Sequence, residues 1–552
     1  MRRPVMRRPG FPLVVTLLAL AFLGLFLLYP LFGIFKASVL DSTGAHVTAN
    51  NYLRVLGRSF YQRALGNSLA IGAAATVVTT LIGVPLAFCL ARIRIPGKSV
   101  LLALATLPLV LPSFVGAYAL VLLFGRAGIV TQALRAIGIP FDSIYGAPGL
   151  VVVYALTLFP YVLLPTLAAF KAVDISVEEA GQNLGASRWR TWWTVILPIV
   201  MPAVLAGALL VFMDTLENFG VPFVLAEDMP ILAVEAWKQF VGETGGNPAT
   251  AGVLGVLLIV CTTLTLLAQR HYLARRRFAT GARTAPPLLA VAPPVRALAV
   301  GFSWGIVALA LVPFCAVIVI SLLRFRGPVL TAEFSLGNFA QLFARAPGPL
   351  ANTLLLASGA AVAAALLGVP IGYVLTRTRT RLTGLLDVVA MVPFAVAGTV
   401  LGIGLVIAFN SGFLVLTGGW LILVIAYAVR KLPFNVRASS AILHQIDPSL
   451  EEASINLGVS PAMTFVKLTV PLMLGGIVGG MVLTWVTVAS ELSSTVILYS
   501  GKWSTMTIVM FQALEGTSAG VASAAATVLI VVTIAPLALI NRLLRRQGAS
   551  LM

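Results

Sequence analysis

The chain has 552 residues, of which 59% are hydrophobic and only 10% are charged, and its mean hydropathy is +1.01. A soluble domain carries about 25% charged residues, so this composition excludes an ordinary soluble protein and indicates an integral membrane protein. The net charge of +19 does not indicate a nucleic-acid-binding protein. Lys and Arg concentrate in the predicted inner loops, which is the positive-inside pattern of membrane proteins.

A membrane-spanning helix needs roughly 20 apolar residues, and about twelve such stretches follow one another along the chain. The first begins at Phe11 and is longer than the apolar core of a signal peptide, so it is interpreted as an uncleaved span. The spans are expected near residues 11–35, 64–91, 99–124, 148–171, 199–225, 249–269, 297–321, 351–375, 384–409, 414–436, 472–498 and 518–541.

The predicted spans form two halves of six. Residues 1–269 are the first half, residues 270–296 a basic, Pro-containing inner linker, and residues 297–552 the second half. An even number of spans brings each half back to its starting side of the membrane. We therefore expect parallel repeats related by an axis along the membrane normal, with both termini in the cytoplasm.

Matched residues at an offset of 285 positions support a duplication. Gly83-Val-Pro85 returns as Gly368-Val-Pro370, and Asn67-Ser-Leu returns as Asn352-Thr-Leu. Further matched pairs are Arg92 with Arg377 and Pro108 with Pro393.

Two polar segments, 173–198 and 446–471, interrupt the apolar pattern at equivalent places, and we call them the polar islands. They contain EEAGQNLGASRWRTWWTVILP from Glu178 and EEASINLGVSPAMTFVKLTVP from Glu451, which lies 273 positions further on. Glu, Ala, Gly and Pro keep the same spacing in both. The matched residues are Glu179, Ala180, Gly185 and Pro198 in the first polar island, and Glu452, Ala453, Gly458 and Pro471 in the second.

Each polar island is predicted to begin with a short helix. Ser176-Val-Glu-Glu179 and Ser449-Leu-Glu-Glu452 have the form of a helix capping box, and the following Gly is expected to end the helix in a left-handed turn. The helix should carry exposed acids and a small apolar face formed by Val177, Ala180 and Leu184, or by Leu450, Ala453 and Leu457. Such a helix fits the groove of a partner; the alternative is an ordinary interfacial hairpin.

Both polar islands resemble the EAA loop of permease subunits in binding-protein-dependent ABC importers. That loop has Glu-Ala-Ala, three residues, Gly, then nine residues and an Ile-x-Leu-Pro ending. The chain departs from it at the second Ala, which is Gly181 or Ser454, and its endings are Val195-Ile-Leu-Pro198 and Leu468-Thr-Val-Pro471. The resemblance covers essentially the whole chain, which is similar to the double-length ferric-iron permeases of bacteria.

The resemblance implies an all-α integral membrane protein with the type I ABC importer permease fold, in which about twelve spans form two parallel six-helix repeats. It also implies a bacterial inner-membrane location among lipid, two copies of an ABC ATPase subunit as partners, and a solute-binding protein on the outer side. The residues expected to dock the ATPase are Glu178, Glu179, Ala180, Gly185, Glu451, Glu452, Ala453 and Gly458.

No enzyme site is expected in the chain itself. Gly97-Lys98-Ser99 matches the end of a phosphate-binding loop, but Arg92 stands where that loop requires its first Gly. The His and Cys residues lack metal-ligand or disulfide spacing. We therefore expect no catalytic residue, no metal site, no bound cofactor and no nucleic-acid partner, with ATP used by the partner ATPase. The residues concerned are His46, His271, His444, Cys89, Cys261 and Cys315.

Four polar residues in two spans are candidates for the substrate pathway: Asp214, Glu217, Asn218 and Glu491. An ionisable group at the centre of a span costs about 2.5–3.5 kcal/mol and usually faces the bundle interior or an aqueous path. At the offset of 273, Glu491 aligns with Asn218, and both are expected towards the outer mouth. The alternative is that these groups are solvated or pair with polar groups of adjacent helices.

Carboxylates are hard ligands that suit hard cations, so the candidate acids favour a cationic or metal-bearing substrate. The resemblance to ferric-iron permeases makes ferric iron the favoured substrate, and the acids agree with it. Thiamine and polyamines remain open, and 2-aminoethylphosphonate fits the acids less well. The competing class is an ion-coupled secondary transporter, which would not explain two matched polar islands and would favour acids near mid-span. A membrane-embedded enzyme is disfavoured because no reactive constellation is found.

Overall fold

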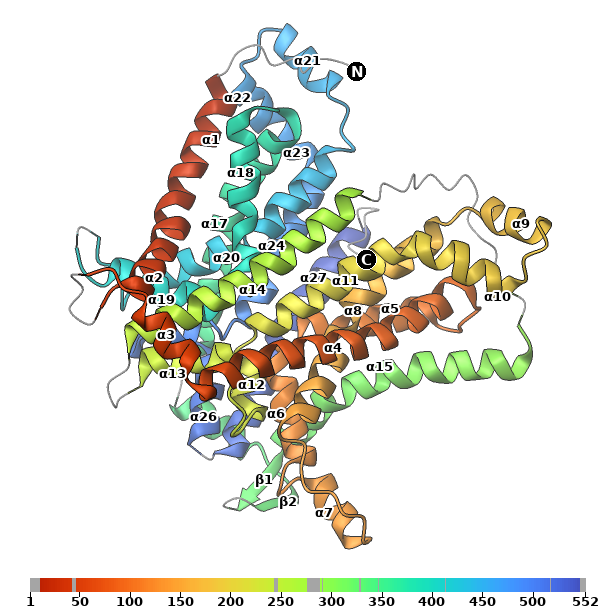
Figure 1. Ribbon diagram of the computed structural model, residues 1–552, viewed down its shortest axis with the longest axis vertical. Coiled ribbons are helices and arrows are strands. Elements are labelled where there is room, and N and C mark those ends of the chain that lie inside the picture. The colour runs from red at the N-terminus through yellow and green to blue at the C-terminus, as the bar shows by residue number, and fades with distance from the viewer. Residues whose placement is uncertain are drawn as a thin grey trace. The chain divides into compact units, whose positions relative to one another are not determined.

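The computed structural model describes residues 10–41, 46–242, 247–275, 288–289, 291–326, 329–345, 347–412, 414–516 and 518–546. Helices dominate these residues, which confirms the all-α membrane fold (Figure 1). The exceptions among them are an antiparallel hairpin of β1 (Leu323–Arg326) with β2 (Val329–Phe334) and an isolated bridge between Leu40 and Val47. Residues 276–287 and 290 of the predicted inner linker lie outside the described residues.

Long apolar helices correspond to the predicted spans. In chain order, these helices are α1 (Gly10–Leu23) with α2 (Tyr29–Val39), α4 (Ser59–Arg92), α5 (Lys98–Val110), α6 (Ser113–Phe124), α8 (Ala147–Ala172), α11 (Leu197–Glu217), α14 (Pro248–Arg275), α15 (Pro293–Ser321), α17 (Gly348–Arg377), α18 (Arg381–Met391), α19 (Gly398–Phe409), α20 (Trp420–Leu443), α24 (Leu474–Ala489) and α27 (Ala519–Arg546).

The shorter helices connect the long ones. They are α3 (Asn50–Gly57), α7 (Ile129–Ala136), α9 (Ile175–Asn183), α10 (Arg188–Thr191), α12 (Gly220–Leu225), α13 (Leu232–Val241), α16 (Gly337–Arg345), α21 (Ser449–Asn456), α22 (Pro461–Thr464), α23 (Val470–Leu472), α25 (Thr495–Leu498) and α26 (Met506–Glu515).

Within the described ranges, nine helices are long and apolar enough to cross a membrane, or eleven if each of two bent helix pairs is one span. The tenth predicted span corresponds to α20, which is less apolar because it carries Arg430, Lys431 and Arg437. With α20 included, every one of the predicted spans has a helix or a bent helix pair.

The third span of each half is broken, although the sequence analysis treats each as one continuous span. In the first half α5 ends at Val110 and α6 begins at Ser113. In the second half α18 leads through a 3-10 turn, Val392–Ala395, into α19, with a bend of 110°. Proline lacks an N–H and disfavours helical geometry in the residue before it, and Pro112 and Pro393 lie at these breaks.

The repeated Gly-Val-Pro motifs mark places where helices approach closely. A Cβ atom at Gly83 of α4 would lie 2.9 Å from the Cβ of Val162 in α8. At the matching place in the second half, a Cβ at Gly368 of α17 would lie 2.6 Å from the Cβ of Asn435 in α20. Both distances are too short for a side chain, so glycine permits these two helix contacts.

Packing divides the described chain into two compact units. One contains the described parts of Met1–Tyr52, Ala236–Val256 and Ser321–Met552, and the other those of Leu53–Glu235 and Leu257–Ile320. The units follow packing, whereas the predicted halves follow chain order, and the boundaries of the halves stay predictions. Each unit joins the second to fifth spans of one half to the first span of the other half, and the boundary between the units divides α14 after Val256.

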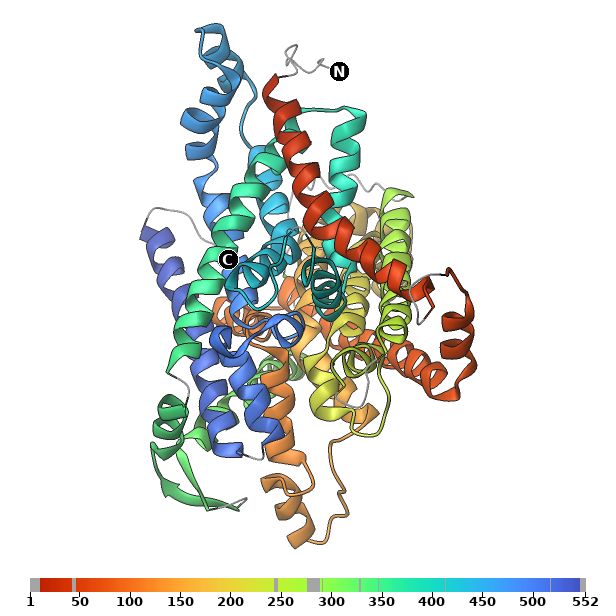
Figure 2. The same cartoon turned by 90° about the vertical axis from the view of Figure 1, so that its left-hand side faces the viewer.

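In the first unit, α1 runs beside α17 and α18 (Figure 1, Figure 2). The ring of Phe11 lies 6.2 Å from that of Tyr373 and 5.5 Å from that of Phe465, and Phe26 lies 5.6 Å from Phe409. These aromatic contacts attach the first span of the chain to the helices of the second half.

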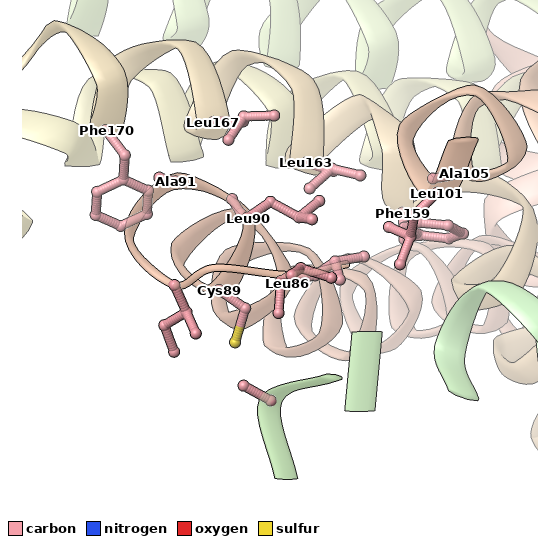
Figure 3. Packing of buried hydrophobic residues seen from close by; sticks show 14 of the residues in the cluster. Leu86, Cys89, Leu90, Ala91, Leu101, Ala105, Phe159, Leu163, Leu167 and Phe170 are labelled. Carbon is pink, nitrogen blue, oxygen red and sulfur yellow. The ribbon is translucent and has the colours of Figure 1, made fainter. Parts of the chain in front are cut away.

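In the second unit, the core lies between α4, α5, α8 and α15. Figure 3 shows Leu86 and Leu90 of α4 beside Phe159 and Leu163 of α8. Val307 and Ala310 of α15 belong to the same cluster of buried side chains. The Trp304 indole of α15 donates a hydrogen bond to the carbonyl of Pro96, 3.3 Å away.

Candidate functional site

Each polar island folds as two short helices joined by a tight turn, with α9 and α10 in one unit and α21 and α22 in the other (Figure 1). Gly185 and Gly458 have φ values of 81° and 90°, the left-handed conformation that glycine adopts easily. The N–H of Ala186 donates to the carbonyl of Gly181, 3.1 Å away, and that of Val459 donates to Ser454, 3.2 Å away. These are the bonds of a Schellman motif, so the predicted glycine stop is confirmed in both copies.

The predicted capping boxes are wrong. Helix α9 begins at Ile175, and its N-cap is Asp174, whose side chain accepts from the N–H of Ser176, 3.0 Å away. In the second polar island the equivalent Asp447 accepts from the N–H of Ser449, 2.9 Å away. Asp is as good a helix-start residue as Ser, and it occurs two positions before the Ser in both copies, so this signal could have been found in the sequence.

The first Glu of each Glu-Glu pair points inward and forms an ion pair with an arginine. Glu451 is 5% exposed, and its Oε1 lies 3.0 Å from Nη2 of Arg377, at the end of α17. The hydroxyl of Tyr373 donates to Oε2 of the same carboxylate, 3.1 Å away. In the other unit Glu178 forms an ion pair with Arg92, which ends α4 and is 4% exposed. The expectation of exposed acids is therefore wrong for Glu178 and Glu451, because a buried guanidinium needs a carboxylate partner.

The remaining predicted docking residues form a small surface on each island. Glu179, Ala180 and Gly185 are exposed in the first polar island; Ala453 and Gly458 are exposed in the second, where Glu452 is half-buried. A large apolar side chain accompanies each turn. Leu184 is 88% exposed and Leu457, its equivalent, is 85% exposed.

Further apolar side chains extend both surfaces. Trp193 and its equivalent Val466 are 49% and 59% exposed, and Trp189 and Leu450 are exposed as well. Polar segments that repeat the same uncovered apolar positions have the composition of an interaction surface.

The candidate pathway residues are divided between the two units, and two of them are engaged by neighbouring polar groups. Glu491 is 7% exposed and pairs with Arg430 of α20, while its Oε2 lies 3.5 Å from Nζ of Lys431. Asn218 donates from Nδ2 to the hydroxyl of Ser113, 3.1 Å away, and accepts from the N–H of Val221 at 3.0 Å. Asp214 and Glu217 are half-buried in the last turns of α11. The alternative of pairing with adjacent helices fits Glu491 and Asn218.

The sequence analysis missed Arg430 and Lys431 as members of this group. Two adjacent cations inside a predicted span are a signal that an acid lies near them. Arg92 and Arg377 were matched between the halves but were given no role at the polar islands. Among the described residues, no group of three or more His, Cys, Asp or Glu side chains could hold a metal ion.

A duplicated set of membrane-spanning helices, with a matched interaction surface in each copy, defines the class of membrane transport components. Two segments of the chain, residues 80–278 and 364–548, match the model of the family described as binding-protein-dependent transport system inner membrane component. The chain belongs to this family, and the segment that defines the family occurs twice in it. It is a multi-pass inner-membrane protein. The duplication predicted from matched residues is thereby confirmed.

Relatives of double length cover most of the chain. It is 29% identical over 529 residues to the ferric transport system permease protein FbpB of Actinobacillus pleuropneumoniae, covering 92% of this chain and 75% of the relative. It is 28% identical over 514 residues to the putative ferric transport system permease protein FbpB 1 of Haemophilus influenzae, covering 90% and 79%. The predicted resemblance to double-length permeases is confirmed.

Among solved structures, the chain resembles a bacterial ABC transporter involved in the import of the acidic polysaccharide alginate. The TM-score is 0.42 and the sequence identity 17%, and the match covers 50% of this chain and 98% of that chain.

Proposed function

We propose that this chain is the permease subunit of an ATP-driven importer of ferric iron, and that two copies of an ATPase subunit bind its polar islands. The family supports a binding-protein-dependent importer and hence a solute-binding protein as one partner. The observation that carries the ATPase docking is the repeated pair of exposed leucines, Leu184 and Leu457, each at the Schellman turn that ends a short helix carrying Glu179 or Glu452.

The docking surface has a defined chemistry. Each short helix ends in an uncovered leucine, and Glu179 or Glu452 adds a carboxylate on the same helix. A complementary groove would be apolar with a basic rim. Both islands face the cytoplasm in this proposal, as do the two termini, and the chain holds no cofactor because the ATPase subunits bind and hydrolyse the ATP.

The transport cycle follows from this arrangement. ATP-driven closure of the two ATPase subunits moves the polar islands towards each other, and the spans attached to the islands open the pathway to the solute-binding protein. Hydrolysis then restores the inward-facing arrangement. The chain supplies no catalytic residue to ATP hydrolysis and acts as the moving membrane part.

Ferric iron is the proposed substrate because the double-length relatives are ferric transport permeases. Asp214 and Glu217 are carboxylates of the kind that suit a hard cation. The charge of Glu491 is offset by Arg430 and Lys431, so the case for iron rests on the relatives. Thiamine, a polyamine and 2-aminoethylphosphonate are the alternative substrates.

The test uses the full chain in proteoliposomes with its ATPase and binding protein. The variant Glu179→Lys with Glu452→Lys reverses the charge on both docking surfaces, so we expect normal insertion, loss of bound ATPase and loss of ATP-dependent iron uptake. Leu336→Asp, a change at an exposed leucine between β2 and α16, is the control and should leave uptake unchanged.

Normal ATP-dependent uptake by the double variant would contradict the docking role. Uptake that continues without ATP and follows an ion gradient would contradict the importer itself. Parallel assays with radiolabelled iron, thiamine and spermidine decide the substrate, because only one of the three should be taken up at a rate that depends on both the binding protein and ATP.

A further inference from the structure

We propose that each polar island is fixed to the end of its core helix at two points, an Arg–Glu ion pair and an aromatic contact, so that the island and the helix move together. Arg92 and Arg377 are thereby positioning residues for transport. This inference rests on the proposed function, since the movement it transmits is that of the bound ATPase.

The first point of attachment is the ion pair near the start of the island. Both Nε and Nη2 of Arg377 donate to Oε1 of Glu451, at 3.1 and 3.0 Å, and Nη2 also donates to the carbonyl of Ile446 at 3.1 Å. In the other unit Arg92 pairs with Glu178. Both arginines lie in the last turn of their helix, so the ion pair joins the end of α17 or α4 to α21 or α9.

The second point of attachment lies at the far end of the island. The ring of Tyr373 is 4.7 Å from that of Phe465, and the ring of Phe88 is 5.9 Å from that of Trp192. Phe465 and Trp192 are the first residues of two π-helical turns, Phe465–Thr469 and Trp192–Ile196, which lead into the next span. The aromatic contact therefore secures the segment that leaves the island.

The two points lie on one face of the core helix. Tyr373 precedes Arg377 by four positions, as Phe88 precedes Arg92, and residues four apart are neighbours on a helix surface. A single contact would allow the island to pivot about it, whereas contacts at its start and its end hold its orientation. This arrangement occurs in both units at equivalent positions, so it belongs to the repeated design of the chain.

Burial of the arginines makes the attachment resistant to separation. Arg92 is almost fully buried, and the Arg377 side chain is 12% exposed. An island that swung away from its helix would leave a buried guanidinium without its carboxylate, which is strongly unfavourable. Force applied to the island is therefore transmitted to α4 or α17 instead of being lost in a local movement.

On the side of the core helix, the two attachments differ by one hydroxyl group. Tyr373 donates to Glu451, while Phe88 at the equivalent position has no hydroxyl. The substitution Tyr373→Phe converts the second attachment to the form of the first and keeps the ring contact. It is therefore the matched control for changes at Arg377.

The experiment measures ATP hydrolysis and substrate uptake in the same proteoliposomes, for the full chain with its ATPase and binding protein. For Arg377→Met and for Glu451→Gln, we expect ATPase binding to persist and uptake per ATP hydrolysed to fall at least about fivefold. The exchanged pair Arg377→Glu with Glu451→Arg should recover part of the lost uptake, and Tyr373→Phe should retain most of it.

Unchanged uptake per ATP in both single variants would overturn the inference. Loss of bound ATPase in parallel with uptake would also overturn it, because the residues would then act in docking. If Arg377→Met fails to insert, Arg377→Lys keeps the charge without the paired donors, and its uptake per ATP must fall for the inference to stand. Failure of the proposed function is distinguished by uptake in the unaltered protein that does not depend on ATP.

Discussion

Glu491 illustrates at the scale of single residues how the two halves have diverged at one equivalent place. Ser113, Thr157 and Asn218 of the first half align with Gly398, Arg430 and Glu491 of the second. The first half joins the start of α6 to the end of α11 by the hydrogen bond from Asn218 to Ser113. In the second half Arg430 fills the space that the missing side chain of Gly398 leaves and pairs with Glu491. The second half therefore has an ion pair to α20 where the first half has a neutral hydrogen bond to α6.

Removal of one partner from this pair should be costly. For Arg430→Thr we expect the free energy of unfolding to fall by about 3 kcal/mol, because Glu491 is buried and loses its nearest cation. The double variant Arg430→Thr with Glu491→Asn copies the residues of the first half and should recover most of the loss. Denaturation of the purified protein measures both values, and an additive effect of the two changes would contradict the pairing.

The sequence predicts positions at this scale better than it predicts their surroundings. The matched spacing identified Glu178 and Glu451, but their partners, Arg92 and Arg377, are more than seventy positions away in the chain. Which face of a short helix turns inward depends on that distant partner. Local signals gave the left-handed glycines correctly, since a turn of this kind depends only on adjacent residues.

At the scale of elements, the π-helical turns are the repeated feature that links each polar island to the following span. In both copies the N–H that follows the turn reaches back five residues, from Leu197 to Trp192 and from Val470 to Phe465. Pro198 and Pro471 come next and lack an N–H. Proline has no N–H to donate to the carbonyl four residues back. The π turn before it, whose closing hydrogen bond spans five residues instead of four, accommodates this missing α-helical bond. Spans were predicted from hydropathy, which does not distinguish an α turn from a π turn.

Substitution of the proline should change the geometry of the connection. Pro471→Ala supplies an N–H for an ordinary α turn, which would rotate the second polar island relative to α24. We expect uptake per ATP to fall by roughly fivefold without loss of stability, measured in the proteoliposome assay and by denaturation.

The matched control for this change is Pro461→Ala. Pro461 is the first residue of α22, where the N–H has no helical partner in any case. This variant should behave as the unaltered protein does. Equal uptake per ATP in both proline variants would show that the π turn has no part in transmission.

At the scale of the whole molecule, packing assigns the first span of each half to the unit that contains the second to fifth spans of the other half, while the sixth span of the first half is divided between the units at Val256. Hydropathy identified the spans, and matched residues identified the duplication, but neither indicates which half a first span packs against. An apolar helix presents a similar composition to either set of neighbours, and helix association in membranes depends on detailed packing. Phe11 and Phe26 supply that packing in the first unit.

This exchange of first spans predicts how the chain behaves when it is divided. Residues 297–552 expressed alone lack α1 and α2, so the surfaces that Phe11 and Phe26 cover on Tyr373, Phe465 and Phe409 are left open. We expect this fragment to be degraded by protease much faster than the same region of the intact chain.

Co-expression with residues 1–269 should restore protection and allow the two fragments to be purified together. The variant Phe11→Ala with Phe26→Ala in the co-expressed first fragment should weaken the association, because each aromatic contact contributes about 0.5–1.5 kcal/mol beyond the burial of area. A second fragment that is protected without the first would contradict the assignment of α1 to its unit, since the helices of one half would then complete their own core.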